Sequence, residues 1–313
     1  MPSGIVPVRA KVSSVVERTS RAFSRKIVAV EACGSAEVTC ISVEAQDSLY
    51  VIENHLVTHN TQLSKTIAYN ANQNGANLLF VALEMTRDEV KSLFIAQHAA
   101  SLDPRGVPWV DAMDGTLNAG QKKLWHRALD DFEIKRHDDH EEIESAAGSL
   151  IIWASVKRIN QSDWANRLRA AKQEHDIHIG VKDYTELVMP KDRDNGGFGN
   201  YRLDLKEMVE EDKALARELD LWVIDNHQIS RGGRDSAEKR EPNHYLKRDL
   251  GESSGLERAA DHILWIYSNH DLKDDRQALV GVAKARKGRE IVHGIHVHAD
   301  FAKANVAPVV QDH

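Results

Sequence analysis

The chain has 313 residues, of which 42% are hydrophobic and 28% charged. This composition suits one large or two ordinary globular domains with a buried core. Charged residues interrupt every hydrophobic stretch, so none approaches the roughly 18 apolar residues that a membrane-spanning helix needs. The formal net charge of -7 argues against a uniformly basic nucleic-acid binder, although local basic loops can still bind phosphates. We therefore expect a soluble protein with no membrane partner.

The cysteines and the N-terminus indicate a cytoplasmic protein. Only Cys33 and Cys40 occur, and their spacing fits neither a disulfide framework nor a paired zinc motif. Residues 1–25 are basic and serine-rich but lack the apolar core of a signal peptide, so we interpret them as a linker. A reducing compartment is the simplest expectation.

The pattern of apolar and polar residues changes near residue 60. Before it, short β-type runs alternate with Gly, Asp and Asn turns, at Lys26–Glu31, Val38–Val43 and Ser48–Ile52. After it, helical patterns alternate with apolar strands, which is typical of a parallel sheet with crossover helices. We therefore predict a small all-β segment at 1–60 and an α/β domain at 61–313, with a mostly parallel sheet flanked by helices.

The elements of the second part follow from spacing. A helix begins near Leu63 and is capped by Gly75, a buried strand spans Asn77–Leu83, and Thr86 with Glu89 forms a capping box for the next helix. The sheet should have about six strands in all. The later predicted strands are 149–153, 177–182, 220–225, 262–267 and 279–284.

Three polar stretches interrupt this pattern. Asp130–Glu144 is mostly charged; its His and Asp residues suggest metal ligands as an alternative, but we interpret the stretch as a solvated connection. The Gly-rich segment Asp192–Asn200 and the basic segment Arg231–Arg248 are typical of long loops that follow strands. Those two loops are candidate DNA contacts.

The most specific short motif is Val57–Thr61, which reads Val-Thr-His-Asn-Thr. Asn60 can cyclise on its own backbone carbonyl and cut the chain, His59 can polarise that peptide bond, and Thr61 offers a hydroxyl that can receive an upstream segment. The motif resembles the C-terminal end of an intein. Taken singly, the residues also fit an ordinary turn at His59 and Asn60.

Cys40 and Thr58 refine this resemblance. In class 3 inteins the initiating nucleophile is a cysteine in an upstream block, and a threonine precedes the final histidine; Cys40 and Thr58 occupy both places. Cys40 also fits a small buried hydrophobic side chain. The resemblance implies that Cys40, Thr58, His59, Asn60 and Thr61 carry out protein splicing with an upstream segment.

Thr61–Ala71 is similar to the helix that follows a GxxxxGK[ST] phosphate-binding loop, with Thr61 as the last residue of the motif. The residues directly before Thr61 contain no Gly-Lys pair. We expect the rest of the loop to come from the upstream segment once splicing has joined it. Thr61 would then act first as a splicing nucleophile and afterwards as a Mg²⁺ ligand.

Further motifs follow in the order found in the DnaB-type, superfamily 4 replicative helicases, which have a RecA-like fold. The matching segments are Leu79–Met85, Ile177–Leu187, Leu221–Arg231, Asp249–Gly255, Ala260–Tyr267 and Val282–Gly288. Two residues depart from the family's pattern: Lys182, where an apolar residue is usual, and Asp225.

The resemblance implies a role for each matching residue. Glu84 activates water, Asp183 holds Mg²⁺ through water, Gln228 senses phosphate, and Lys284 and Arg286 reach across a subunit interface to a neighbour's nucleotide. It also implies ATP and Mg²⁺ as ligands, single-stranded or forked DNA as a partner, and a homo-hexamer after splicing in a bacterial or phage-infected cell. The implied DNA contacts are Arg231, Arg234, Lys239, Arg240, Lys247 and Arg248.

Other interpretations remain open at this point. Taken alone, Glu84 or Asp183 also fits a helix-capping acid, and Gln228 also fits a surface amide. The basic residues also fit a solvated edge or a solvated loop. The chain as a whole also fits a trans-splicing partner that carries an inactive helicase fragment, a RecA-like recombinase or regulatory ATPase, or the inactive product of a frameshift.

Overall fold

The computed structural model describes residues 59–138, 140–145, 147–155, 158–190, 201–229, 231–250 and 254–309. Every described residue belongs to one compact unit, Val57–His313. The predicted β segment at 1–58 and the Gly-rich segment 192–200 lie outside the described residues. Among the described helices, none combines the length and the apolar character needed to cross a membrane.

The first sheet has six strands in the order β2-β3-β4-β1-β5-β6. β4, β1, β5 and β6 are parallel, whereas β2 and β3 continue the sheet antiparallel at one edge. The strands are β1 (Leu78–Ala82), β2 (Glu133–Arg136), β3 (His140–Glu144), β4 (Ser149–Ala154), β5 (Ile179–Asp183) and β6 (Trp222–Asp225). The predicted α/β fold with a mostly parallel sheet is confirmed.

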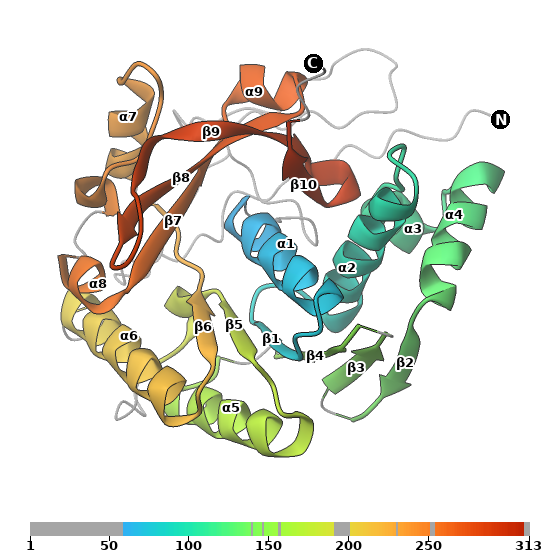
Figure 1. Cartoon of the computed structure of the whole chain (residues 1–313), viewed down its shortest axis with the longest axis horizontal. Coiled ribbons are helices and arrows are strands. Elements are labelled where there is room, and N and C mark those ends of the chain that lie inside the picture. Colours follow the sequence, from blue (N-terminus) through green and yellow to red (C-terminus); the bar gives the residue numbers. More distant parts are fainter. Residues whose placement is uncertain are drawn as a thin grey trace, which may run out of the picture. The chain divides into compact units, whose positions relative to one another are not determined.

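Helices cover both faces of this sheet (Figure 1). Leu78, Phe80 and Ala82 point to the face covered by α1 (His59–Gln73) and α2 (Arg87–Leu102). Leu79 and Val81 point to the other face, which α5 (Gln161–His175) and α6 (Tyr201–Glu218) cover. A strand buried on both faces is apolar throughout, which explains why β1 has no polar alternation.

The predicted local signals around α1 and α2 are confirmed. Gly75 follows α1 with φ of 93°, a backbone conformation that glycine adopts without strain. Thr86 and Glu89 form the predicted capping box at the start of α2. The chain then continues through α3 (Trp109–Asp114) and α4 (Ala119–Asp130), which pack beside α2.

A second sheet has four antiparallel strands in the order β10-β9-β8-β7. Its strands are β7 (His262–Tyr267), β8 (Gln277–Ala285), β9 (Ile291–Asp300) and β10 (Asn305–Pro308). The segments 262–267 and 279–284 are strands as predicted, but our assignment of them to the parallel sheet is wrong. β9 carries apolar residues on alternate positions with histidines between them, a period-2 pattern that we did not interpret as a strand.

Two of the polar stretches also differ from the prediction. Asp130–Glu144 contains β2 and β3 rather than a solvated connection, and Glu141 and Glu142 are buried there. Both carboxylates have partners: Lys91 lies 3.1 Å from Glu141, and the His175 ring lies 3.2 Å from Glu142. Arg231–Arg248 is not one loop: it contains α7 (Arg231–Glu238) and the start of a 3-10 helix at Lys247–Leu250. Two short helices, α8 (Ser254–Ala259) and α9 (His270–Asp274), complete the fold.

Candidate functional site

Polar side chains meet where the parallel strands of the first sheet end. Asp183 is the last residue of β5, Glu84 follows β1 by two positions, and Asn226 follows β6 directly. The N-terminus of α1, which carries Thr61, lies at the same edge. The carboxyl ends of parallel strands are where open α/β sheets bind their ligands. These polar residues therefore lie at the edge of the sheet where a ligand is expected.

Thr61 and Asp183 are in direct contact although they are far apart in the chain. The Thr61 hydroxyl lies 3.0 Å from Oδ1 and 2.8 Å from Oδ2 of Asp183. The Asn226 amide donates to Asp183 Oδ1 at 2.6 Å and to the Ser64 hydroxyl at 2.8 Å. All four side chains are buried. The hydroxyl and the carboxylate are thus held in a fixed geometry by α1, β5 and β6.

The start of α1 adds positive electrostatic potential to this group. α1 begins at His59, so its first unpaired backbone N–H groups lie directly beside Thr61. The helix dipole favours an anion at this end, and phosphate-binding α/β proteins use helix N-termini in this way. Asn60 is fixed here because its side-chain amide donates to the backbone carbonyl of His227.

Three carboxylates lie close enough to influence one another. Burial raises the pKa of Glu84 to about 7, and the charges of Asp183 and Glu186 add to the shift. Burial also raises the pKa of Asp183 to about 6, against hydrogen bonds from Asn226 and Thr61 that favour its charged form. Titratable groups with raised pKa values in one cluster are a frequent property of functional sites.

Some polar atoms at this edge have no partner within the described part of the chain. Oε2 of Glu84 is buried without a hydrogen bond, and so are both amide atoms of Gln62 on the first turn of α1. An unpaired buried polar atom costs about 1–3 kcal/mol, so such atoms indicate a missing ligand, water or ion. Thr61 and Asp183 offer the hydroxyl and carboxylate oxygens that Mg²⁺ prefers. These residues therefore fit a hydrated cation together with an anion.

In the part of the chain that the structure describes, no group of three or more His, Cys, Asp or Glu side chains is placed to hold a metal ion. A cation here would thus need oxygen ligands from water and from a bound ligand in addition to the protein. The alternative of a metal site within 137–140 gains no support from the described residues, among which His137 and His140 instead stack at 4.2 Å.

Comparison with known proteins identifies the family. A family model described as the DnaB-like helicase C terminal domain matches residues 44–304. The chain belongs to this DnaB-like helicase C-terminal domain family.

Relatives and solved structures agree with this result. The chain is 30% identical to the replicative DNA helicase DnaB of Geobacillus stearothermophilus over 48% of this chain and 34% of the relative. It is 24% identical to DnaB of Mycobacterium intracellulare over 79% of this chain and 38% of the relative. The chain therefore spans only about a third of the length of these relatives.

Two similar structures confirm the fold. One solved structure, described as an ATPase domain, matches with a TM-score of 0.61 at 19% identity, covering 80% of each chain. A DnaB-like replicative helicase, solved to study its interactions with primase, matches with a TM-score of 0.61 at 20% identity, covering 79% of this chain and 54% of that one. The described α/β core therefore has the RecA-like fold of helicase ATPase domains.

The two departures from the family's pattern, Lys182 and Asp225, are partners of each other. Lys182 is fully buried on the far side of β5 from Asp183, where its ammonium pairs with Asp212 of α6 and lies 3.1 Å from Asp225. Burial alone would lower the pKa of Lys182, but the two carboxylates outweigh it and raise that pKa. Gln161 and Trp164 each donate to Asp212 at 2.7 Å. The charge of Lys182 is therefore balanced by Asp212 and Asp225, and Lys182 does not pair with Asp183.

Gln228 lies near the cluster, but its side chain is exposed. Its backbone N–H donates to Oε1 of Glu186 at 3.1 Å, which holds the segment after β6 against the residues after β5. Sequence reasoning missed Glu186, Asn226 and Ser64. Asn226 carried a usable signal, since it follows a predicted parallel strand directly.

Lys284 and Arg286 lie away from Thr61 in the same chain. Ala285 pairs with His262, whose ring stacks on Trp222 at the start of β6, whereas Asp183 and Asn226 are at the ends of β5 and β6. Lys284 donates to the backbone carbonyls of Glu257 and, at 2.7 Å, of Ala260, and Arg286 pairs with Asp261 at 2.7 Å. Their predicted role at a neighbour's nucleotide stays a prediction.

The predicted DNA-contacting residues differ in their surroundings. Arg240 is clamped by two hydrogen bonds to the buried Asp249, Arg234 pairs with Glu238 at 3.0 Å, and Lys247 pairs with Glu290 at 2.6 Å. Lys239 and Arg248 are exposed, and nothing is described of the Arg231 side chain. Arg240 therefore has a structural role in addition to any contact with DNA, and the assignment of all six stays a prediction.

The predicted splicing residues lie partly outside the described residues. Cys40 and Thr58 are not described, and His59 is described only by its backbone. The Asn60–Thr61 peptide bond lies in the first turn of α1. The splicing assignment therefore rests on the sequence motif.

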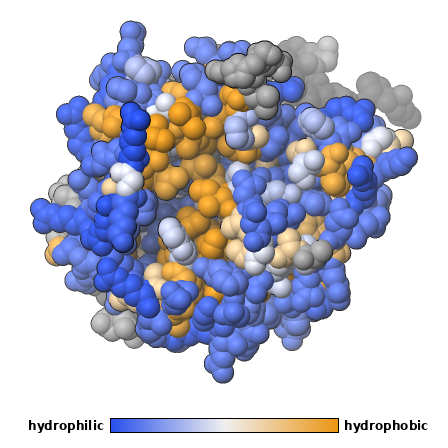
Figure 2. Space-filling model, in the orientation of Figure 1, coloured by the Kyte–Doolittle hydropathy of each residue, from blue (hydrophilic) through white to orange (hydrophobic). Residues whose placement is uncertain are grey.

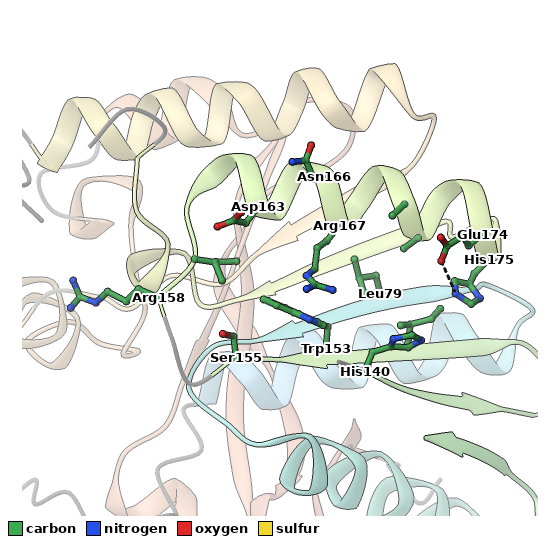
Figure 3. Close-up of a pocket in the computed structure, with 14 residues that line it drawn as sticks. Leu79, His140, Trp153, Ser155, Arg158, Asp163, Asn166, Arg167, Glu174 and His175 are labelled. Atoms are coloured by element: carbon green, nitrogen blue, oxygen red, sulfur yellow. Dashed lines mark ion pairs between the residues drawn. The ribbon is translucent and has the colours of Figure 1, made fainter. Parts of the chain in front are cut away.

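A separate groove of about 590 Å³ lies between α5 and the strands β1, β3 and β4. Figure 3 shows Arg167 of α5 extending toward Trp153, and its guanidinium lies 3.9 Å from the centre of that ring. None of the residues predicted to act on nucleotide, DNA or the splice junction lines this groove.

Proposed function

We propose that this chain is the C-terminal part of an ATP-dependent replicative DNA helicase motor whose phosphate-binding site is completed when protein splicing joins an upstream segment to Thr61. The observation that carries the proposal is the contact between the Thr61 hydroxyl and both carboxylate oxygens of Asp183. A hydroxyl at a helix N-terminus beside an acid at a strand end is the arrangement that holds a hydrated cation against a nucleotide phosphate.

Each residue at the strand ends has a task in this proposal. Thr61 and Asp183 would hold Mg²⁺, and the N-terminus of α1 would bind the phosphates. Mg²⁺, when bound, supplies positive charge to the phosphate oxygens. Glu84 accepts a proton from the attacking water, and its pKa of about 7 suits a general base near neutral pH.

The remaining tasks belong to the assembled ring. Lys284 and Arg286 would stabilise phosphate charge on a neighbouring subunit, and Gln228 would sense the phosphate. Lys239 and Arg248 are exposed cations suited to the backbone of single-stranded or forked DNA. The homo-hexamer, its DNA and its use of ATP are part of the same proposal, since the chain covers only part of its relatives.

The splicing step involves the bond between Asn60 and Thr61. The side-chain nitrogen of Asn60 attacks its own backbone carbonyl carbon, the Asn60–Thr61 bond breaks, and Thr61 keeps the released amine while Asn60 becomes a succinimide. His59 donates a proton to the leaving nitrogen. Because the Asn60 side chain now donates to the carbonyl of His227, it must leave that contact before it can attack.

Intact-mass analysis of the expressed chain tests the splicing part. The chain should release a product that begins at Thr61, and Asn60→Ala should abolish that release. Asn54→Ala removes an asparagine six positions upstream and should leave the release unchanged. The same product from Asn60→Ala would show that the assignment of Asn60 is wrong.

A further inference from the structure

Both residues that are predicted to reach a neighbour's nucleotide are attached to one short segment of their own chain. The segment Glu257–Asp261 contains the last turn of α8 and leads into β7. Lys284 donates to two of its backbone carbonyls, one of them that of Ala260 at 2.7 Å. The guanidinium of Arg286 lies 2.7 Å from Oδ1 of Asp261, and its backbone N–H donates to the Asp261 carbonyl at 2.9 Å. We call this segment the holder turn.

A third cation fastens the holder turn to α6. Lys213 donates to Oδ1 of Asp261 at 2.7 Å and to the carbonyl of Ala259 at 2.9 Å. The residue before it on α6, Asp212, pairs with the buried Lys182 of β5. Two consecutive residues of α6 thus connect the holder turn to the parallel sheet, and Figure 1 shows α8 beside α6. The holder turn is therefore fixed with respect to the sheet of its own subunit.

The carboxylate of Asp261 lies between two cations that differ in exposure. Its Oδ1 is 2.7 Å from both Lys213 and Arg286. The hydrogen bond from Lys213 lowers the pKa of Asp261, and the charges of Lys213, Arg286 and Arg217 act in the same direction, so Asp261 is ionised at neutral pH. The Lys213 side chain is 19% exposed, whereas that of Arg286 is 51% exposed. Lys213 is therefore the inner partner of Asp261, and Arg286 is the partner that meets solvent.

Arg286 lies at a hydrophilic part of the surface. The residues between β8 and β9, Arg286–Glu290, are all charged or glycine. Figure 2 shows hydrophilic surface where β8 ends and β9 begins. An arginine without a fixed partner samples many rotamers, and the entropy lost on ordering it opposes binding. The pair with Asp261 removes part of that freedom in advance. Because a guanidinium has five N–H donors, donors also remain for a phosphate.

We propose that Asp261, anchored by Lys213, is a positioning residue for the reaction on the neighbouring subunit, where it orients Arg286 toward the phosphate without binding nucleotide itself. The inference rests on the proposed function, in which Arg286 stabilises phosphate charge across the interface. A displacement of about 1 Å in a group that acts on the reaction can cost about 100-fold in rate, so loss of this orientation should slow hydrolysis. A purely structural ion pair would instead affect stability and leave the rate unchanged.

Labelling of Arg286 in the 313-residue chain tests whether Asp261 holds it. Phenylglyoxal reacts with accessible guanidinium groups, and mass spectrometry of a digest measures the labelling of each arginine. Asp261→Asn should raise the labelling rate of Arg286 about two- to fivefold, as expected for a half-exposed ion pair. Asp114→Asn, which changes an exposed carboxylate on α3, is the matched control and should leave the rate unchanged. Equal labelling of Arg286 in the wild type and in Asp261→Asn would overturn the proposal.

ATP hydrolysis by the joined protein tests the effect on the reaction. In this protein, the part of the Geobacillus stearothermophilus DnaB helicase that precedes its counterpart of α1 is fused to Thr61. Asp261→Asn should lower kcat about tenfold or more and change KM by less than about twofold, because Asp261 does not bind nucleotide. Its Tm should stay within about 2 °C of the wild type, since a half-exposed ion pair adds little stability. An unchanged kcat, or a loss of kcat that accompanies a large fall in Tm, would overturn the proposal.

A double-mutant cycle in the joined protein separates positioning from a general effect on the subunit. If Asp261 acts through Arg286, Asp261→Asn should change the residual rate of Arg286→Ala by less than about twofold, whereas independent roles would multiply the two losses. Multiplied losses in an active joined protein would overturn the role of Asp261 and leave the proposed function standing. A joined wild type that hydrolyses no ATP would contradict the proposed function itself.

Discussion

Replacing Glu84 by glutamine should make the protein more stable at pH 8 while removing its proposed catalytic base. The pKa of Glu84 is about 7 in the folded protein against an ordinary 4.5, because of burial and the charges of Asp183 and Glu186. Between these values the folded state holds a proton that the unfolded state has lost. Stability therefore falls as the pH rises from about 4.5 to about 7, and glutamine, which cannot ionise, removes this loss.

The magnitude follows from the pKa. At about 1.4 kcal/mol per pH unit, the upper limit at pH 8 is about 3 kcal/mol. The side chain is only partly buried, so solvent screening should reduce the gain to roughly 1–2 kcal/mol. For a domain of this size that corresponds to a rise in Tm of about 2–8 °C. The gain should be small at pH 4.5, where the unfolded state also binds the proton.

Thermal unfolding of the wild type and Glu84→Gln at pH 4.5 and pH 8 measures this difference. Glu207→Gln, which changes an exposed carboxylate on α6, is the matched control and should not alter Tm at either pH. If Glu84→Gln were only as stable as the wild type at pH 8, or less stable, the reasoning that ionised Glu84 lowers the stability of the folded protein would be refuted.

Three further predictions follow from the contacts. Lys182→Met leaves the buried Asp212 and the partly buried Asp225 without their cation and should lower the free energy of unfolding in urea by about 3–5 kcal/mol; a loss below about 1 kcal/mol would contradict the pairing. In the joined protein, Thr61→Val should weaken binding of Mg²⁺ with ATP by about tenfold or more in calorimetry, whereas Thr61→Ser should retain it. Lys239→Ala should weaken DNA binding and reduce the salt slope by about one, without changing Tm; an unchanged slope would remove Lys239 from the interface.

The parallel sheet and the central contact of the site were predictable from the sequence. Strands buried on both faces are apolar runs, and the residue that follows such a run lies at the carboxyl edge of the sheet. The family resemblance singles out Glu84 and Asp183, and this local rule explains why they lie at the same edge. Thr61 joins them because it lies in the first turn of α1, the helix before β1. None of these inferences needs knowledge of distant side-chain contacts.

The second sheet and the buried ion pairs were not predictable in the same way. β7 and β8 are apolar runs that look like strands of the first sheet, and only their pairing with β9 separates them. Lys182 looked like a disturbance of Asp183 because its partner Asp212 lies 30 residues away on α6. Similarly, Glu141 looked solvated because the lysine that pairs with it is 50 residues away. Such pairings depend on tertiary contacts, which the local periodicity of the sequence does not predict.

ATP hydrolysis in the presence of Mg²⁺, compared between the 313-residue chain and the protein joined at Thr61, tests the central claim most directly. The joined protein should hydrolyse ATP, Glu84→Gln should abolish that hydrolysis, and the 313-residue chain should show none. Hydrolysis by the 313-residue chain that Glu84→Gln abolishes would contradict the claim that the site is completed at Thr61, as would an inactive joined protein.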